Sequence, residues 1–504
     1  MANYLFDRLL SSAVPPDRPF IQPGPGPGLD YGGLRRATGR LAHVLQGLGV
    51  LPGDRVAVQV DKGVDAIVLY LACVRAGAVF LPLNTGYTPA EIDYFVGDAR
   101  PRLLVVGTGG VAAAREIAAR HGARVETLDP AGGGSLQVAA ARAPDDFATV
   151  PRGADDLAAI LYTSGTTGRS KGAMLSHANL ASNAETLVDY WRFTASDVLI
   201  HALPIFHTHG LFVATNVILL AGASMIFLTR FDASEVLSLM PRATCLMGVP
   251  TFYTRLVDHP GLDRAAVAGM RLFISGSAPL LAETHRDFAD KTGQAILERY
   301  GMTETNMNTS NPYDGERVPG TVGFPLPGVT LRITDPENGA ALPPGEIGMI
   351  EVKGPNVFKG YWQMPEKTAA EFRPDGFFIT GDLGLVDARG YVQILGRGKD
   401  LVISGGFNVY PKEVEGEIDA LPGVIESAVI GLPHADFGEG VTAVVVRRKG
   451  ADVTEAGVLE ALTGRLAKFK QPKAVIFVDD LPRNTMGKVQ KNILRETYKG
   501  LYKP

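Results

Sequence analysis

Short apolar runs alternate with longer amphipathic stretches through the first 300 residues of the chain. Runs rich in valine, leucine and isoleucine at 55–60 and 102–107 predict buried strands, and the apolar stretch at 65–77 predicts a helix. The same alternation returns at 196–300, where three further strand candidates are separated by helical segments. Strands that alternate with helices build parallel sheets covered by helices. We therefore expect an α/β fold with parallel-type sheets in this part of the chain.

The pattern changes near residue 320 and again after residue 400. Short runs broken by glycine and proline follow residue 320, which indicates an antiparallel β region. After residue 400, strand and helix candidates fit a small α+β domain. The charged segment GRGKD at 396–400 separates the two regions. The sequence thus predicts an N-terminal domain at 1–396, a hinge at 397–400 and a mobile C-terminal domain at 401–504.

The charge balance excludes some classes of partner. The 504 residues include 49 Lys and Arg against 53 Asp and Glu, a net charge of −4, so neither nucleic acid nor an anionic membrane is an expected partner. The segment 465–503 is locally basic, with ten basic and three acidic residues. It is either a solvated surface or a face that meets polyanionic small molecules.

The chain shows no pattern of a membrane or secreted protein. Its longest apolar run, from Val217 to Leu228, is interrupted by Gly222 and is too short to span a membrane. The first ten residues lack the pattern of a signal peptide. Cys73 and Cys245 stand in apolar stretches without metal-binding spacing, so we expect buried reduced thiols and a cytoplasmic protein.

The segment LYTSGTTGRSKG at 161–172 joins an apolar strand to a loop rich in hydroxyl groups and glycine. Glycine lets backbone amides point at phosphate oxygens, hydroxyls add donors, and a cation neutralises charge. The loop is not a Walker A loop, because that pattern, counted from Gly165, needs glycine at 170 and a hydroxyl residue at 172. We predict phosphate binding by seven residues: Thr163, Ser164, Gly165, Thr166, Thr167, Gly168 and Lys171.

With eight further segments, this loop resembles the adenylate-forming superfamily, which includes acyl-CoA synthetases, luciferases and the adenylation domains of peptide synthetases. The segments are LPLN at 81–84, LPIFHTHG at 203–210, SGSAPL at 275–280, ERYGMTE at 298–304, TGD at 380–382, GRGKD at 396–400, SGGFNVYPKEVE at 404–415 and PRNTMGK at 482–488. The resemblance covers nearly the whole chain, and its motifs stand in the superfamily's order.

The resemblance implies a two-step reaction. Superfamily members activate a carboxylate with ATP to an acyl-adenylate and pyrophosphate, and the thiolate of coenzyme A then displaces AMP. ATP and coenzyme A are thus implied as co-substrates and Mg²⁺ as cofactor. Catalytic roles are implied for Lys488, Thr303 and His207, with Lys488 bridging the carboxylate and the phosphates. Glu304 and Thr163 would hold the magnesium.

The nucleotide site, the hinge and the thiol site are implied in the same way. Tyr300 would stack on adenine, and Asp382 and Arg397 would contact the ribose. The other implied nucleotide contacts are Gly276, Ser277, Ala278, Glu298, Arg299 and Gly301. Asp400 would be the pivot about which the C-terminal domain rotates between the two steps. Coenzyme A contacts are implied for Ser404, Gly405, Gly406 and Lys412.

The expected acyl pocket is more polar and more cationic than a fatty acid would need. Its implied members are His207, Thr208, Arg255, Ser277, Arg286 and Met307. Because an unpaired buried charge is costly, a cation beside the acid indicates a substrate with a second carboxylate. Arg255 is our first candidate for pairing with that distal carboxylate, with Arg286 and Arg299 as alternatives.

The pocket segments resemble the malonate branch of the superfamily, in which Thr208 and Met307 would crowd the C2 substituent. The implied reaction joins malonate to coenzyme A and gives malonyl-CoA, AMP and pyrophosphate, with methylmalonate as a poorer substrate. A short-chain or aryl carboxylate–CoA ligase, a peptide-synthetase adenylation domain and a non-catalytic adenine-nucleotide-binding protein are the alternatives. Relatives in the superfamily also imply a lysine acetyltransferase, acting on Lys488, as a partner.

Overall fold

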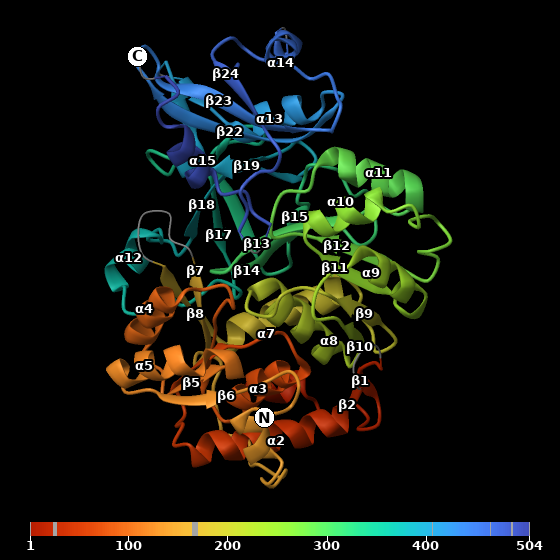
Figure 1. Ribbon diagram of the computed structural model, residues 1–504, viewed down its shortest axis with the longest axis vertical. Helices are drawn as coiled ribbons and strands as arrows, with labels where there is room; N and C mark the ends of the chain where they lie inside the picture. Colours follow the sequence, from red (N-terminus) through yellow and green to blue (C-terminus); the bar gives the residue numbers. More distant parts are fainter. Residues whose placement is uncertain are drawn as a thin grey trace.

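The computed structural model describes residues 2–23, 28–163, 170–405, 407–463, 465–484 and 487–502. The helices and strands in these ranges build four β-sheets, two of which are mostly parallel and covered by helices (Figure 1). The α/β class predicted from the alternating pattern is confirmed, with a large N-terminal part and a small C-terminal part.

The first sheet has six strands in the order β6-β5-β3-β4-β7-β8. Its strands are β3 (Arg55–Gln59), β4 (Val79–Pro82), β5 (Leu103–Val106), β6 (Arg124–Thr127), β7 (Leu157–Thr163) and β8 (Lys171–Ser176). Neighbouring strands are parallel except β7 and β8, which pair antiparallel. The accompanying helices are α2 (Tyr31–Gly47), α3 (Val64–Arg75), α4 (Pro89–Ala99), α5 (Val111–His121) and α6 (Ser135–Ala140). The strands predicted at 55–60 and 102–107 and the helix at 65–77 are therefore confirmed as β3, β5 and α3.

The second sheet has nine strands in the order β15-β14-β13-β12-β11-β9-β10-β1-β2. Its strands are β1 (Pro19–Ile21), β2 (Leu29–Asp30), β9 (Val198–His201), β10 (Ser224–Phe227), β11 (Cys245–Gly248), β12 (Leu272–Ser275), β13 (Leu297–Met302), β14 (Asn306–Ser310) and β15 (Phe324–Pro325). The central strands from β1 to β13 are parallel, and both ends of the sheet are antiparallel. Its helices are α1 (Phe6–Leu9), α7 (His177–Tyr190), α8 (Asn216–Ala221), α9 (Ala233–Leu239), α10 (Pro250–Asp258) and α11 (Ala282–Thr292).

A shared hydrophobic core joins these two sheets. Val56 and Val58 of β3 belong to the same buried cluster as Leu199 of β9 and Leu272 of β12. Helix α7 lies between the sheets (Figure 1). It begins directly after β8 because the Ser176 hydroxyl accepts from a backbone amide in the first turn of the helix. The two layers therefore hold their strand ends in one fixed arrangement.

The long apolar run and the two cysteines fold as ordinary core. Gly222, with φ +61°, ends α8, so the apolar run is divided between that helix and β10. No helix within the described ranges has the length and apolarity that crossing a membrane requires. Cys73 and Cys245 are free and fully buried, as predicted.

The third sheet is the antiparallel region predicted after residue 320. Its order is β16-β17-β18-β19, with β16 (Thr330–Thr334), β17 (Gly348–Lys353), β18 (Phe378–Val386) and β19 (Val392–Arg397). Helix α12 (Pro365–Ala370) lies between β17 and β18 in the chain. The register of β18 and β19 sets Asp382 directly opposite Arg397.

A 3₁₀ turn at Gly398–Asp400 leads to the fourth sheet and its own core. The elements are β20 (Val402–Ser404), β21 (Phe407–Val409), α13 (Pro411–Asp419), β22 (Val424–His434), β23 (Gly438–Arg447), α14 (Glu455–Leu462), β24 (Ala474–Val478) and α15 (Lys491–Tyr498). Valines, isoleucine and leucines of this part alone form a separate buried cluster. The change of sheet falls at the predicted hinge, and we retain 1–396, 397–400 and 401–504 as the proposed division. The locally basic segment after β24 contains α15.

The C-terminal part packs on the large part through the loop that precedes α15. Gly487 lies beside Thr251 of α10, since a Cβ added at Gly487 would be 3.7 Å from that side chain. An exposed ion pair of 3.8 Å joins Arg448 to Glu283 of α11. In this orientation the loop that carries Lys488 faces the large part of the chain.

Candidate active site

The candidate site lies where the carboxyl ends of the parallel strands β9, β12 and β13 meet the Lys488 loop of the C-terminal part. His207 follows β9, Ser277 follows β12, and Arg299 and Tyr300 stand on β13. Ligands of open parallel sheets bind at this edge of the sheet. The fold thus brings three of the sequence motifs to one place.

A π-helix at His209–Thr215 fixes the segment that carries His207. The carbonyl of Gly210 accepts from His201 Nε2 at 2.8 Å and from the Thr215 hydroxyl at 3.0 Å. Glycine is required at 210 because a Cβ there would lie 2.1 Å from the Pro204 carbonyl oxygen. This π-helix was not predicted from the sequence. Short π-helices are frequent at functional sites.

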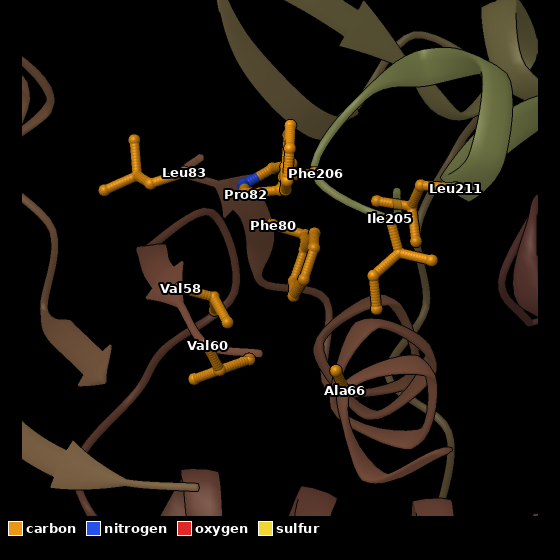
Figure 2. A pocket seen from close by; sticks show the side chains of 9 residues that line it. All are labelled: Val58, Val60, Ala66, Phe80, Pro82, Leu83, Ile205, Phe206 and Leu211. Carbon is orange, nitrogen blue, oxygen red and sulfur yellow. The ribbon is translucent and has the colours of Figure 1, made fainter. Parts of the chain in front are cut away.

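An apolar pocket anchors the same segment on the first sheet (Figure 2). The lining side chains are Val58, Val60, Ala66, Phe80, Pro82, Leu83, Ile205, Phe206 and Leu211. Three of them come from the chain immediately around His207, and the others come from the first sheet and α3. The segment is therefore held by apolar contacts on one side and by hydrogen bonds on the other.

The acyl-pocket residues Thr208, Ser277 and Met307 are brought together. Thr208 is buried and donates through Oγ1 to Asn306 Oδ1 at 2.9 Å, directly beside Met307 in the chain. Met307 is buried, and its amide and carbonyl both bond to the side chain of Asn183 on α7. Ser277 adopts φ +75°, a left-handed conformation that is uncommon outside glycine and is found at functional sites.

Two histidines, the half-buried His207 and the buried His209, border this pocket. His209 is fully buried, and its Nδ1 lies 3.1 Å from the Ser277 hydroxyl. Desolvation, together with the charges of Lys488 and Arg299, lowers the pKa of His207 to about 3. Both rings are neutral near pH 7, because the pKa of His209 is also held well below its usual value by burial. His207 therefore offers a hydrogen-bonding group beside two cations without adding a third charge.

Arg299 is a buried cation without a partner for two of its nitrogens. Its residue is 3% exposed, and Nε and Nη2 have no hydrogen-bond partner among the described residues. Burial lowers its pKa to about 9. The guanidinium lies over Gly276, where an added Cβ would be 2.3 Å from Cζ. Glycine at 276 thus opens the space that lets this arginine reach the pocket.

The structure does not bring Arg255 and Arg286 into this buried cluster. Both residues are exposed, Arg255 on α10 and Arg286 on α11. Arg255 stands one turn after Thr251, which is beside Gly487, so it lies on the face of α10 that borders the Lys488 loop. Its role in binding the acid stays a prediction.

Lys488 stands in the field of four charged groups that lie outside the C-terminal part. Burial lowers its pKa, Arg397 and Arg299 lower it further, and the carboxylates of Asp382 and Glu304 raise it. The loop is closed by a hydrogen bond of 3.0 Å from the Lys488 amide to Asn484 Oδ1. Two carboxylates and two guanidinium groups of the large part therefore surround one lysine of the small part.

The predicted ribose residues form an ion pair. Arg397 Nε lies 2.8 Å from Asp382 Oδ1, and the Tyr300 hydroxyl donates to Asp382 Oδ2 at 2.5 Å. The Asp382 carboxylate raises the pKa of Arg397. Gly301 permits the tight hairpin of β13 and β14, because a Cβ there would lie 1.8 Å from the Asn306 carbonyl oxygen. The hairpin places Tyr300, Thr303 and the buried Glu304 on one short stretch of chain.

Glu304 and Thr163 have the chemistry of a magnesium site. Glu304 is 6% exposed, and burial raises the pKa of its carboxyl group. No cluster of three His, Cys, Asp or Glu side chains occurs in the part of the chain that the structure describes. Mg²⁺ commonly takes one or two carboxylates plus phosphate oxygens, so a buried carboxylate and a threonine beside a nucleotide fit it.

Parts of the predicted phosphate and thiol loops lie outside the described residues. These are Ser164, Gly165, Thr166, Thr167, Gly168 and Gly406. The flanking Thr163 and Lys171 are directly opposite each other at the ends of β7 and β8. Such an antiparallel pair brings the two ends of the loop together.

The hinge and coenzyme A predictions fall on the C-terminal part. Asp400 pairs with Arg495 of α15. Ser404 is buried, and Gly405 is exposed with φ +61°. Lys412 lies 3.9 Å from Glu415, and its charge lowers the pKa of Glu298 of the large part, although burial raises that pKa to about 7 overall. Lys412 therefore faces the large part in this orientation.

Two groups near the site, the buried Tyr361 and the half-buried Glu371, were missed from the sequence. Both lie in the segment GYWQMPEKTAAEF at 360–372, which is outside the motifs named above. Tyr361 is 2% exposed and contacts Glu304 through its hydroxyl. The signal available was a run of aromatic and acidic residues in a turn-rich stretch, which is too common to single out a site.

Comparison with known proteins agrees with this geometry. A family model described as AMP-binding enzyme matches residues 11–362, and one described as AMP-binding enzyme C-terminal domain matches residues 413–488. A crystal structure of ATP-bound MatB from Rhodopseudomonas palustris is 68% identical over 100% of both chains, with a TM-score of 0.98. A feruloyl-CoA synthase from Amycolatopsis sp. is 38% identical over 94% of each chain. A malonate–CoA ligase from Arabidopsis thaliana is 34% identical over 98% of this chain and 84% of its own.

Proposed function

Because the chain belongs to the AMP-binding enzyme family, we propose that it is an AMP-forming acid–thiol ligase that joins malonate to coenzyme A. ATP and coenzyme A are its co-substrates, and malonyl-CoA, AMP and pyrophosphate are its products. The similarity to a malonate–CoA ligase over nearly the whole chain supports this substrate. The polar and cationic pocket around His207, Ser277 and Arg299 supports it independently.

In the first step one malonate carboxylate attacks the α-phosphorus of ATP. A new oxygen–phosphorus bond forms, and the bond to pyrophosphate breaks. Lys488 neutralises the carboxylate and the phosphate as they meet, and Thr303 donates to the α-phosphate. Tyr300 and the Asp382–Arg397 pair orient adenine and ribose. The loop from Thr163 to Lys171 receives the outer phosphates.

In the second step the thiolate of coenzyme A attacks the acyl carbon. A carbon–sulfur bond forms, the bond from that carbon to the bridging oxygen of the acyl-adenylate breaks, and AMP leaves with that oxygen. The glycine-rich loop at Ser404 and Gly405 would approach the site after rotation at Asp400, with Lys412 close to the phosphates of coenzyme A. Glycine at φ +61° lets the backbone of this loop make a tight turn. The orientation described here, with Lys488 at the site, suits the first step.

Malonate differs from most acids of such enzymes in its second carboxylate, and Arg299 is the buried cation placed to receive it. Its two unpaired nitrogens lack acceptors in the described chain, and a carboxylate supplies two oxygens in matching geometry. Arg255, at the border of the Lys488 loop, is the exposed candidate for the same carboxylate, and Arg286 is the third. This unpaired buried guanidinium is the single observation that carries the malonate proposal.

We further propose that Mg²⁺ is held by Glu304 with Thr163. Bound there, the ion neutralises the triphosphate and polarises its oxygens. Glu304 supplies a buried carboxylate, and Thr163 supplies oxygen at the end of β7.

The test of the function is an acid panel. Purified protein with ATP and Mg²⁺ is given malonate, methylmalonate, acetate, succinate, benzoate or ferulate, and pyrophosphate release is followed. We expect the highest kcat/KM for malonate, a lower value for methylmalonate, and AMP and malonyl-CoA when coenzyme A is added. Preference for an acid with one carboxylate would refute the malonate assignment but leave the ligase class intact.

An aryl carboxylate is the second candidate, favoured by the similarity to a feruloyl-CoA synthase. An aryl ring brings no second carboxylate, so the buried Arg299 charge would stay unpaired, which costs free energy. The benzoate and ferulate arms of the panel decide between the two substrates.

We also propose a cytoplasmic location and control by a lysine acetyltransferase at Lys488. The two free, buried cysteines are compatible with a reducing compartment. Acetylation removes the charge of Lys488 and therefore its action on the phosphates.

A further inference from the structure

Four side chains from three segments of the chain form one group of contacts. The group includes the lysine of the phosphate loop and the proposed magnesium ligand Glu304. The Tyr361 hydroxyl lies 2.6 Å from Glu371 Oε2 and 3.1 Å from Glu304 Oε1. Lys171 Nζ lies 3.0 Å from Glu371 Oε1 and 4.1 Å from the centre of the Tyr361 ring. These contacts connect the lysine of the phosphate loop to the magnesium carboxylate through one phenol and one carboxylate.

Backbone pairing fixes Tyr361 in this position. Tyr361 pairs antiparallel with Ala173 of β8, the strand that Lys171 begins. On either side of it, the Met174 amide donates to Gly360 at 2.9 Å and the Trp362 amide donates to Gly172 at 2.7 Å. The Phe358 amide donates to the Glu304 carbonyl at 2.8 Å. Tyr361 thus stands on a short segment, held by a single β-bridge to β8, between the chain of Lys171 and the chain of Glu304.

Aromatic packing and charge hold the other members. The Tyr361 ring meets Phe358 edge to face, with centroids 4.8 Å apart. Glu371 is held by a second ammonium group, that of Lys367 at 2.8 Å. Because two ammonium groups hold the Glu371 carboxylate in its charged form, it accepts a strong charge-assisted hydrogen bond from the Tyr361 phenol. The phenol has one proton for two carboxylates, so a change at one carboxylate is transmitted to the other.

We infer that Tyr361 and Glu371 are positioning residues for the metal and phosphate half of the site. Tyr361 orients the Glu304 carboxylate, and Glu371 holds both the Tyr361 phenol and the Lys171 ammonium. The inference rests on the proposed roles of Glu304 and Lys171 in binding Mg²⁺ and ATP. Removal of a group that orients a metal ligand commonly weakens metal affinity by about 10–100-fold.

The experiment measures ATP affinity by titration calorimetry, with and without Mg²⁺ and without any acid, so that no reaction occurs. Tyr361→Phe keeps the ring contacts and removes the hydroxyl. We expect affinity for ATP to fall about tenfold with Mg²⁺ and to change less than about twofold without it. The matched control is Tyr391→Phe, which removes a phenol bond of 2.8 Å to the Glu316 carbonyl. It should leave both affinities unchanged.

Glu371→Gln supplies a second variant. It keeps the shape of the side chain and removes its charge. Because Glu371 holds both the Tyr361 phenol and the Lys171 ammonium, this variant should lose affinity for ATP with Mg²⁺ and, to a smaller extent, without it. If the two residues act as one unit, the double variant loses no more affinity than the larger single loss. If the fold-losses of ATP affinity of the two single variants instead multiply in the double variant, the two residues act independently, and the coupled arrangement is overturned.

Two other results would overturn the inference. Equal loss with and without Mg²⁺ would mean that Tyr361 only supports the fold of the loop, and no loss in either titration would mean that it does not position Glu304. If the unaltered protein binds ATP equally well with and without Mg²⁺, the proposed metal site at Glu304 is refuted. Because no acid is present, failure of the malonate assignment in the acid panel leaves these outcomes unaffected.

Discussion

Replacement of Arg299 by methionine should separate stability from malonate binding. The guanidinium is 3% exposed and two of its nitrogens have no partner in the described chain, so solvent does not screen its charge. Methionine keeps a long flexible chain in the same space and removes the unpaired charge. Replacing an unpaired buried charge with an apolar group relieves a desolvation cost, so Tm should stay level or rise.

Affinity for malonate should move in the opposite direction. Removing one partner of a buried charge pair costs ~2–5 kcal/mol of binding, and the lower value corresponds to about 30-fold in KM. The assay is pyrophosphate release at saturating ATP and Mg²⁺ with varied malonate, repeated with varied ATP. Malonate KM should rise at least 30-fold in Arg299→Met, and ATP KM should change much less.

Arg255→Met is the matched variant, because it makes the same replacement at the exposed position on α10. A large rise in malonate KM in Arg255→Met, with none in Arg299→Met, would assign the distal carboxylate to Arg255. A fall in Tm of Arg299→Met together with an unchanged malonate KM would refute the reasoning, since it would make Arg299 a structural group.

Three further predictions follow from the site. Thr208→Gly combined with Met307→Ile should shift the kcat/KM ratio toward methylmalonate by ~10-fold, because crowding at C2 is relieved; unchanged selectivity would place both residues outside the acyl pocket. Burial raises the pKa of Glu298 to about 7 from an ordinary value near 4.5, so stability should fall as pH rises from 5 to 7 and stay reduced above 7. Calorimetry of Glu298→Gln should show a smaller fall in Tm over that range, and an identical fall would contradict the assignment. Quantitative acetylation of Lys488 should lower malonate-dependent pyrophosphate release by about 100-fold or more, and a retained rate would rule out its catalytic role.

The fold was largely predictable because its strands and helices carry strong local patterns. Runs such as 55–60 and 102–107 have the β-branched composition of buried parallel strands, and they form β3 and β5. The glycine and proline punctuation after residue 320 predicted antiparallel pairing, and β16 to β19 pair in that way. The π-helix at 209–215 was not predictable, because its geometry depends on the close approach of Gly210 to Pro204.

The members of the site were predictable from motifs, but their partners were not. Asp382 and Arg397 are 15 residues apart in the chain, and only the register of β18 and β19 makes them an ion pair. Tyr361 and Glu304 are brought together by a single β-bridge from Tyr361 to β8 that no local pattern indicates. Sequence motifs give residue types and order, whereas pairing depends on contacts between distant segments.

The same dependence on distant contacts decides which of the three candidate arginines binds the distal carboxylate of the acid. Arg299 stands within a motif and Arg255 within a helix, and nothing in the sequence beside either one marks it as the partner of a carboxylate. Only the fold shows that Gly276 leaves room for the Arg299 guanidinium and that the surrounding chain supplies no acceptor for two of its nitrogens. A folded protein keeps such an unpaired charge at a cost, and the cost is offset when a bound anion completes the pair. The second carboxylate of malonate would complete it, and an acid with one carboxylate, already committed to the α-phosphate, would not.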